Sequence, residues 1–364
     1  MDNLLSAIQN VGYPVNANVR ITPLTFFDEQ TLSATVGENR FFTSDTLSTF
    51  TRNKKFPLSG NEIAFIDTVA VRLMGTAALS LTAANMGLFT KTALQVLVDG
   101  RERLKIPLVE CLQVFVGNQI GTTTTLTLGD LVTRSKKLRL PIIINSQSNV
   151  EVKIITDADY NALGVVRVEL SGLMYSKLSA FDINFAANRS VERLSYSMFD
   201  TVAVPTAAST LNLFTSADKT QSLFSKIFPL SNSETFDIEN VEVVFPVSIG
   251  TAATTFQAIQ ALAKECMLKL NINGVDFLEL AGKDLVSVIF QNTVAGTIKH
   301  SDGTITTNII GNQISYAGIT LPVAVTVPAK AQVKVTLDVN AITNISTSAY
   351  INVLLKGTLQ RLVQ

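Results

Sequence analysis

The chain has 364 residues, of which 47% are hydrophobic and 16% are charged, and its 29 basic residues balance its 29 acidic residues. A balanced charge excludes the global positive field that sequence-independent nucleic-acid binding requires. Two cysteines are too few for a disulfide framework, and no apolar run is long enough for a membrane-spanning helix. The length allows two domains with full cores, and the low charged fraction predicts that other subunits cover part of the surface.

Residues 1–18 predict a short N-terminal arm. They contain neither Lys nor Arg, and they show no basic and apolar pattern of a secretory signal. Four apolar side chains recur at helical spacing before Gly12 and Pro14 end the pattern: Leu4, Leu5, Ile8 and Val11. A helix this short needs a docking surface. We expect an internal contact arm that touches a membrane surface or a neighbouring subunit; packing on its own domain, or disorder, stays open.

The rest of the chain repeats itself. Residues 19–73 align with residues 191–245 without a gap, and 15 of these 55 positions are identical. Average composition would give about three or four identities. The match continues with small insertions to the C-terminus, so the repeat has the size of a domain. We predict a first domain over residues 19–178, a connector over 179–190 and a second domain over 191–364.

Each copy is predicted to be all-β. Alternating runs rich in Val, Ile, Thr and Phe recur at matched positions, for example residues 66–73 and 238–245. Asp99-Gly100 and Asn273-Gly274 each separate two such runs and predict tight hairpin turns. Residues 79–92 and 255–264 have the pattern of short helices. The expected fold is a tandem pair of jelly-roll β-sandwiches, with the unmatched loops over 107–139 and 279–320 free to make distinct contacts.

Phe56-Pro57-Leu58-Ser59 returns as Phe228-Pro229-Leu230-Ser231, just before a long predicted strand in each copy. We predict that both phenylalanines anchor a core and that both prolines set the entry to the strand, where a missing N–H does no harm.

The sequence offers almost no catalytic residues. His300 is the one histidine, and its loop position indicates a polar surface residue rather than the base of a nucleophilic site. Asp157 and Asp159 provide too few oxygen ligands for calcium, and Cys111 and Cys266 lie in apolar runs that predict buried thiols. We therefore expect no enzyme activity, no cofactor and no metal.

The duplicated domains of about 170 residues, the empty catalytic inventory and the short arm resemble the double jelly-roll major capsid proteins, the lineage of adenovirus hexon and of tailless membrane-containing bacteriophages. The resemblance implies a structural protein of an icosahedral virion, made in the host cytoplasm. It also implies homotrimers that form pseudo-hexagonal capsomers and contact neighbouring capsomers and other capsid proteins, such as a vertex protein. An internal lipid membrane stays open, and no sequence-specific nucleic acid is implied.

Two other classes stay open at this stage. A receptor-binding or carbohydrate-binding β-sandwich, such as a spike or lectin, would be indicated by clustered exposed aromatic residues. The chain has no Trp and six Tyr. A β-sandwich enzyme would need an acid/base constellation, which the sequence does not provide.

Overall fold

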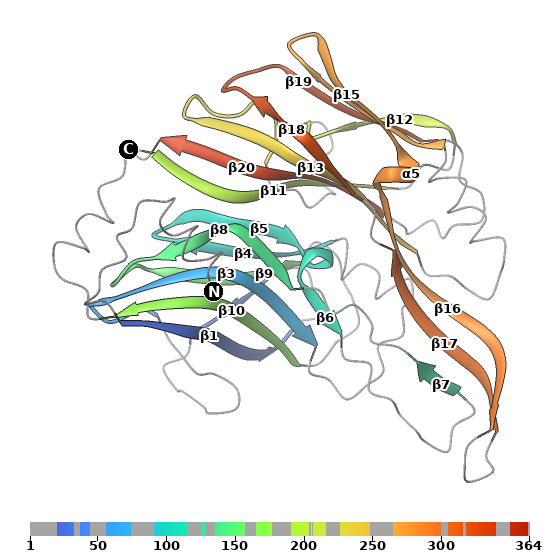
Figure 1. Ribbon diagram of the computed structural model, residues 1–364, viewed down its shortest axis with the longest axis horizontal. Helices are drawn as coiled ribbons and strands as arrows, with labels where there is room; N and C mark the ends of the chain where they lie inside the picture. Colours follow the sequence, from blue (N-terminus) through green and yellow to red (C-terminus); the bar gives the residue numbers. More distant parts are fainter. Residues whose placement is uncertain are drawn as a thin grey trace.

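The computed structural model describes the following residues: 20–32, 37–43, 56–73, 91–114, 125–128, 135–156, 165–176, 191–203, 205, 207–215, 226–247, 265–299, 305–315, 318–339 and 350–362. Most of these residues lie in β-strands. The strands form two stacked β-sandwiches, which Figure 1 shows one above the other.

The first sandwich consists of two sheets. Sheet A has the strand order β1 (Arg20–Thr31), β10 (Val165–Ser176), β3 (Glu62–Leu73) and β8 (Lys136–Ile144). Sheet B has the order β2 (Gly37–Phe41), β9 (Val150–Thr156), β4 (Thr92–Val98) and β5 (Arg101–Pro107). A short 3₁₀-helix, η1 (Leu108–Glu110), leads into β6 (Leu112–Val114), which pairs parallel with the end of β3. Eight antiparallel strands in two sheets make a jelly roll.

The second sandwich repeats this arrangement. Sheet C has the order β11 (Val191–Ala203), β20 (Tyr350–Leu362), β13 (Glu234–Val247) and β18 (Ile319–Val327). Sheet D has the order β12 (Ser209–Leu213), β19 (Val333–Val339), β14 (Met267–Ile272) and β15 (Val275–Ala281), and a helical turn, α5 (Gly282–Leu285), takes the place of η1. The matched strand orders confirm the predicted tandem jelly-roll fold.

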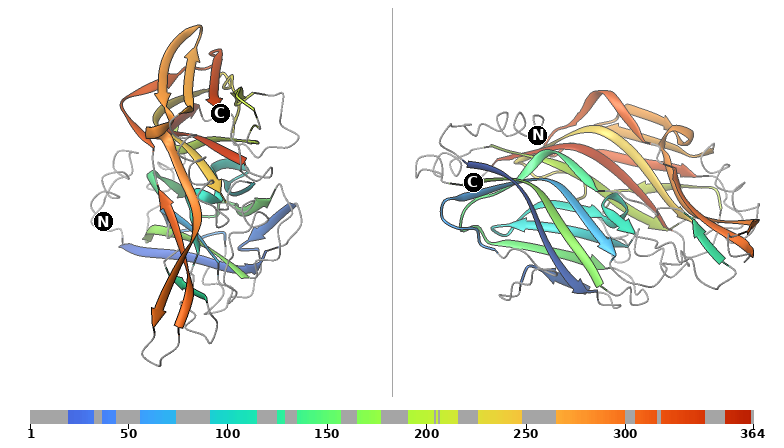
Figure 2. Two further views of the ribbon diagram at one scale, coloured as in Figure 1. Left: turned by 90° about the vertical axis from the view of Figure 1, so that its right-hand side faces the viewer. Right: turned by 60° about the horizontal axis from the view of Figure 1, so that its bottom comes forward.

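The unmatched loops contribute extra strands that join the two halves of the chain. In the second half, β16 (Val286–Lys299) and β17 (Ile305–Ser315) form a long antiparallel hairpin that continues sheet C. β17 pairs parallel with β7 (Thr125–Leu128) of the first half, starting at Asn308 and Thr125. Figure 2 shows this hairpin as a projection beyond the sandwiches. The loops that sequence matching could not align therefore contact each other.

Both predicted hairpin turns are confirmed. Asp99 and Gly100 have φ angles of 53° and 71°, and Asn273 and Gly274 have φ angles of 53° and 84°. Two consecutive residues with positive φ form the tight turn that matches strand twist. The Asp99 amide donates to the Asn149 carbonyl at 2.7 Å, and its carboxylate accepts from the Asn149 amide at 2.8 Å. The side chain thus fixes the turn to the neighbouring loop.

A buried aspartate holds an unusual backbone conformation in each copy. Phe42 and Phe214 follow β2 and β12 with φ angles of 61° and 58°, a region that costs a side-chain-bearing residue about 1–2 kcal/mol. The amide of Phe42 donates to Asp28 at 2.5 Å, and that of Phe214 donates to Asp200 at 2.6 Å. Charge-assisted hydrogen bonds of this kind offset the cost. The repeated Asp and Phe therefore work as a pair.

The repeated Phe-Pro-Leu-Ser segments close one end of each core. The Phe56 ring packs edge-on against Phe42 at 5.5 Å, and the Phe228 ring packs against Phe214 at 5.8 Å. Phe228 is buried, whereas Phe56 is half-buried against its cluster. Both Phe–Pro peptide bonds are cis. The predicted anchoring role is thus confirmed for Phe228 and holds in part for Phe56.

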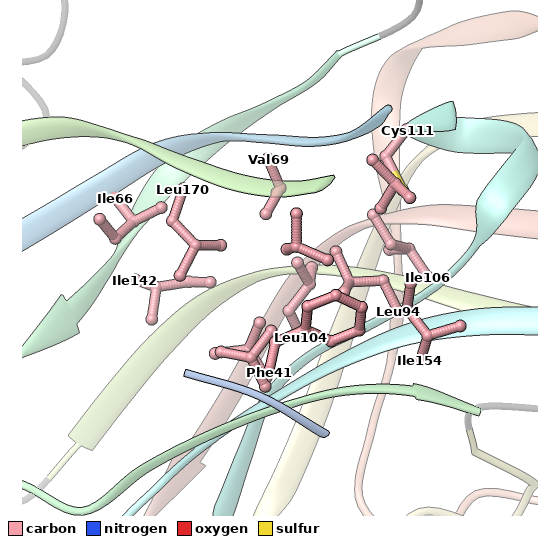
Figure 3. Packing of buried hydrophobic residues seen from close by; sticks show 14 of the residues in the cluster. Phe41, Ile66, Val69, Leu94, Leu104, Ile106, Cys111, Ile142, Ile154 and Leu170 are labelled. Carbon is pink, nitrogen blue, oxygen red and sulfur yellow. The ribbon is translucent and has the colours of Figure 1, made fainter. Parts of the chain in front are cut away.

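Each sandwich has an apolar core between its sheets. Figure 3 shows Ile66, Val69 and Leu170 of sheet A facing Leu94 and Ile154 of sheet B. Six of the 15 identical positions belong to the core of the first sandwich or pack against it: Phe42, Phe56, Leu58, Ile66, Val69 and Val71. The predicted helix over 255–264 lies outside the described residues. The one over 79–92 does so as well, except for Lys91 and Thr92, and Thr92 begins β4.

Candidate functional site

Among the described residues, buried apolar and polar contacts occur together at the interface between the two sandwiches. The outer face of sheet C lies against strands β5 and β8, which are edge strands of the first sandwich (Figure 1). Strand alternation turns Phe199, Val244 and Leu354 away from their own core. All three are at most 1% exposed and belong to the core cluster of the first sandwich. The two sandwiches therefore share buried apolar surface.

A buried ion cluster crosses this interface. Glu110, which is 1% exposed, accepts from Lys136 of its own sandwich at 2.8 Å and pairs with Lys356 of the second sandwich at 2.9 Å. Lys356 also pairs with the buried Glu242, and Lys136 donates to the Ser197 hydroxyl at 3.2 Å. Two carboxylates and two ammonium groups balance one another. Removing one member of such a cluster leaves a buried charge uncompensated and is strongly destabilising.

A second group of polar contacts lies nearer the ends of β11 and β20. Glu192 pairs with Arg103 across the interface and with Arg361 of its own sandwich. The Tyr196 hydroxyl donates to Glu102, which also accepts from Gln95 at 2.7 Å. These contacts join β11 to β5, whereas the ion cluster joins the second sandwich to η1 and β8.

The corresponding outward positions of the first sandwich carry two charged residues and one Phe. Phe27, Arg72 and Glu169 of sheet A correspond to Phe199, Val244 and Leu354 of sheet C. There the Arg72 Nε pairs with Glu169 at 2.9 Å. The Arg167 guanidinium lies 4.6 Å from the centre of the Phe27 ring and pairs with Glu29. The outer face of sheet A is therefore charged where the outer face of sheet C is apolar.

The corresponding edge strands of the second sandwich expose large apolar side chains. β15 and β18 correspond to β5 and β8, which β11 covers in the first sandwich. On β15 and β18, Val275, Phe277 and Val323 are 59%, 50% and 78% exposed. Large apolar side chains that are exposed on edge strands are typical of a contact surface. The contact within the chain thus uses one copy of each of two unlike faces.

Of the residues considered for chemistry, the structure describes only the two cysteines. Cys111 and Cys266 are buried, as predicted, and burial raises the pKa of the Cys266 thiol to about 11. His300, Asp157 and Asp159 lie outside the described residues, as do the arm residues Leu4, Leu5, Ile8 and Val11. Among the described residues, no three His, Cys, Asp or Glu side chains gather as a metal site would require, and no helix is long and apolar enough to cross a membrane.

The interface residues were missed by sequence reasoning. Phe199, Val244 and Leu354 belong to ordinary alternating strands, and Glu110 follows an apolar run without a motif. One signal was available: at matched outward positions, the first copy has charged residues where the second has apolar ones.

No protein-family model matches the chain, and no curated protein matches it. Among solved structures, the chain is similar to PBCV-1 VP54, fitted into a reconstruction of the virophage Sputnik, at 12% identity over 97% of this chain and 98% of that chain, with a TM-score of 0.35. It is also similar to the major capsid protein P2 from bacteriophage PM2, at 9% identity over 95% and 98% of the two chains, with a TM-score of 0.37.

Proposed function

We propose that the chain is the major capsid protein of an icosahedral virus, a structural subunit of the virion without enzyme activity. The observation that carries this proposal is the unlike pair of faces used between the two sandwiches. An interface of this head-to-tail kind generates a ring or a filament when it is repeated, whereas a symmetric contact would end at two units.

Repeating the contact between chains gives the proposed assembly. The β15–β18 edge of one chain docks on the charged part of the outer face of sheet A of the next chain, around Phe27, Arg72 and Glu169, as the β5–β8 edge docks on sheet C within the chain. Each chain contributes two sandwiches, so three chains close a ring with six similar lateral faces, as a hexagonal lattice site requires. We propose this homotrimer as the capsomer, with domains over residues 19–178 and 191–364.

The chemistry of these two faces supports a contact of moderate polarity. Val275, Phe277 and Val323 supply apolar surface on one side. Phe27 and the ion pair between Arg72 and Glu169 lie on the other. Interfaces between subunits that fold before they assemble commonly combine an apolar centre with polar groups.

Further partners belong to the same proposal. Neighbouring capsomers and other capsid proteins, such as a vertex protein, would meet the rim of the ring, and the zero net charge gives no support to direct binding of the genome. The spike or lectin alternative has weaker support, because Phe277 is the one aromatic residue among the exposed large hydrophobic side chains of the described residues.

The test is the mass of the purified protein in solution. Sedimentation equilibrium at micromolar concentration and neutral pH should give three times the chain mass, and negative-stain images should show a hexagonal outline. Val323→Asp with Phe277→Asp should give a folded monomer, because two charges would be buried at each contact. Leu362→Asp changes a side chain that is 57% exposed on sheet C and should leave the trimer intact. A monomeric or dimeric wild-type protein would refute the proposal.

A further inference from the structure

The outer face of sheet A carries an apolar patch at the end where β1 begins. We call it the β1-end patch, and it consists of Ile21, Ile63, Phe65, Leu173 and Tyr175. The strand register places Ile21 and Ile63 on either side of Tyr175, and Phe65 beside Leu173. The rings of Phe65 and Tyr175 lie 4.8 Å apart between centroids.

This patch is buried although it faces away from the core. Ile63, Phe65, Leu173 and Tyr175 are 1%, 0%, 3% and 1% exposed. On β10, Met174 points into the core of the first sandwich, so its neighbours point outward, and neither core cluster includes any residue of the patch. The Tyr175 hydroxyl is buried without a hydrogen-bond partner in the described part of the chain, and burial raises its pKa. Because these four side chains are almost fully buried on an outward face, another segment must pack over them.

The second sandwich shows that the fold itself does not require this patch. The five matching positions of sheet C are all polar: Arg193, Thr235, Asp237, Thr358 and Gln360. There the Asp237 carboxylate accepts hydrogen bonds from Gln360 at 3.1 Å and from Thr326 at 2.6 Å. The apolar patch is thus a property of the first copy alone.

What distinguishes the first copy is the segment that precedes it. β1 begins at Arg20, which pairs with Ser176 directly beside Tyr175, so the chain enters the sheet at the patch. The ten residues from Val11 to Ile21 can span up to about 33 Å. Gly12 and Pro14 lie between them and permit a reversal of direction. The arm can therefore return over the face from which β1 departs.

We propose that the N-terminal arm covers the β1-end patch of its own chain through Leu4, Leu5, Ile8 and Val11. The spacing of these four side chains places them on one face of a helix. The arm contains no Lys or Arg, so no basic side chain would have to be desolvated at the apolar patch. The arm is then part of the first domain, rather than a segment that reaches a neighbouring subunit or a membrane. This inference does not depend on the capsid role.

The experiment measures access to the patch with a thiol reagent. Leu173→Cys places a thiol in the patch, and Ile63→Cys provides a second site should the first variant fold poorly. The two native cysteines are buried, so their background reaction is low. In the full-length protein without lipid, the new thiol should react with DTNB at least tenfold more slowly than after deletion of residues 2–12. Leu5→Asp with Ile8→Asp should have the same effect as the deletion.

Ser6→Asp with Asn10→Asp is the matched control, because these residues fall on the opposite face of the predicted helix and the variant should keep the thiol protected. Circular dichroism should show that each variant is folded. Three outcomes would overturn the proposal. Protection that persists after the deletion would assign the cover to another segment, such as the connector over 179–190. Protection that is lost on dilution to monomers would assign it to a neighbouring chain. Protection that appears only with phospholipid vesicles would assign it to a membrane.

Discussion

Phe199 and Phe27 occupy the same position of the two sandwiches in different surroundings, and this allows a sharp test of the shared core. Phe199 is 0% exposed and packs into the cluster of the first sandwich. Replacing a fully buried phenylalanine by alanine costs about 3–5 kcal/mol. Phe27 is half-buried, and the Arg167 guanidinium lies over its ring. Its loss should cost about 1–2 kcal/mol, from partial burial and a cation–π contact.

Both variants should be compared in the Val323→Asp, Phe277→Asp background, so that subunit contacts do not enter the free energy of unfolding. Because the chain has no Trp, the unfolding is best followed by far-ultraviolet circular dichroism in urea. With an m-value of about 3 kcal/mol per molar, Phe199→Ala should lower the urea midpoint by about 1 M or more, and Phe27→Ala by about half that or less.

The shape of the transition carries further information. If the sandwiches share a core, the parent protein should unfold in one transition, and Phe199→Ala should broaden or split it, because the coupling between the two halves is weakened. Equal costs for the two substitutions, or two separate transitions in the parent, would refute the shared core.

Three further predictions concern single positions. Gly357→Ala should destabilise the protein by at least about 1–3 kcal/mol, because its Cβ would lie 1.8 Å from the Asp237 carbonyl oxygen, whereas Gly60→Ala, with open space around it, should change the urea midpoint little. The Cys266 thiol should not react with DTNB at pH 8 until the protein unfolds, since burial raises its pKa to about 11. Burial opposes the charged form of Glu234, but hydrogen bonds and the charge of Lys226 lower its pKa below 4.5 overall. This contribution to stability is present above pH 4.5 and is lost as pH falls through the lowered pKa, so the stability difference between wild type and Lys226→Met should shrink in acid.

The duplication and the matched strands of each copy could be predicted from the sequence because core and turn positions repeat. Asp28, Phe42 and Asp99-Gly100 have counterparts at the same places, and each pair performs the same local task. Core packing and turn geometry depend on residues close in the fold of one domain, so the two copies preserve the same signals.

The interface could not be predicted in the same way, because outward positions do not repeat. Arg72 corresponds to Val244 and Glu169 to Leu354, and an alternating strand tolerates either kind of residue on its outer face. Whether such a position is solvated or covered depends on the relative placement of the domains, which no local pattern encodes. The buried charge of Glu110 has the same origin, since its partners come from the other sandwich. The boundaries of the domains and the role of the arm stay predictions.

The joining of two sandwiches in one polypeptide changes what their mutual contact can contain. A contact between separate molecules must overcome the loss of translational and rotational freedom at each encounter, whereas a tether replaces that requirement by a high effective concentration. The desolvated carboxylates of Glu110 and Glu242 can therefore lie in a joint that forms when the chain folds, before any other subunit arrives. The contacts left for association are then free to be weaker and reversible, which permits a misplaced subunit to dissociate while the covalent joint stays intact.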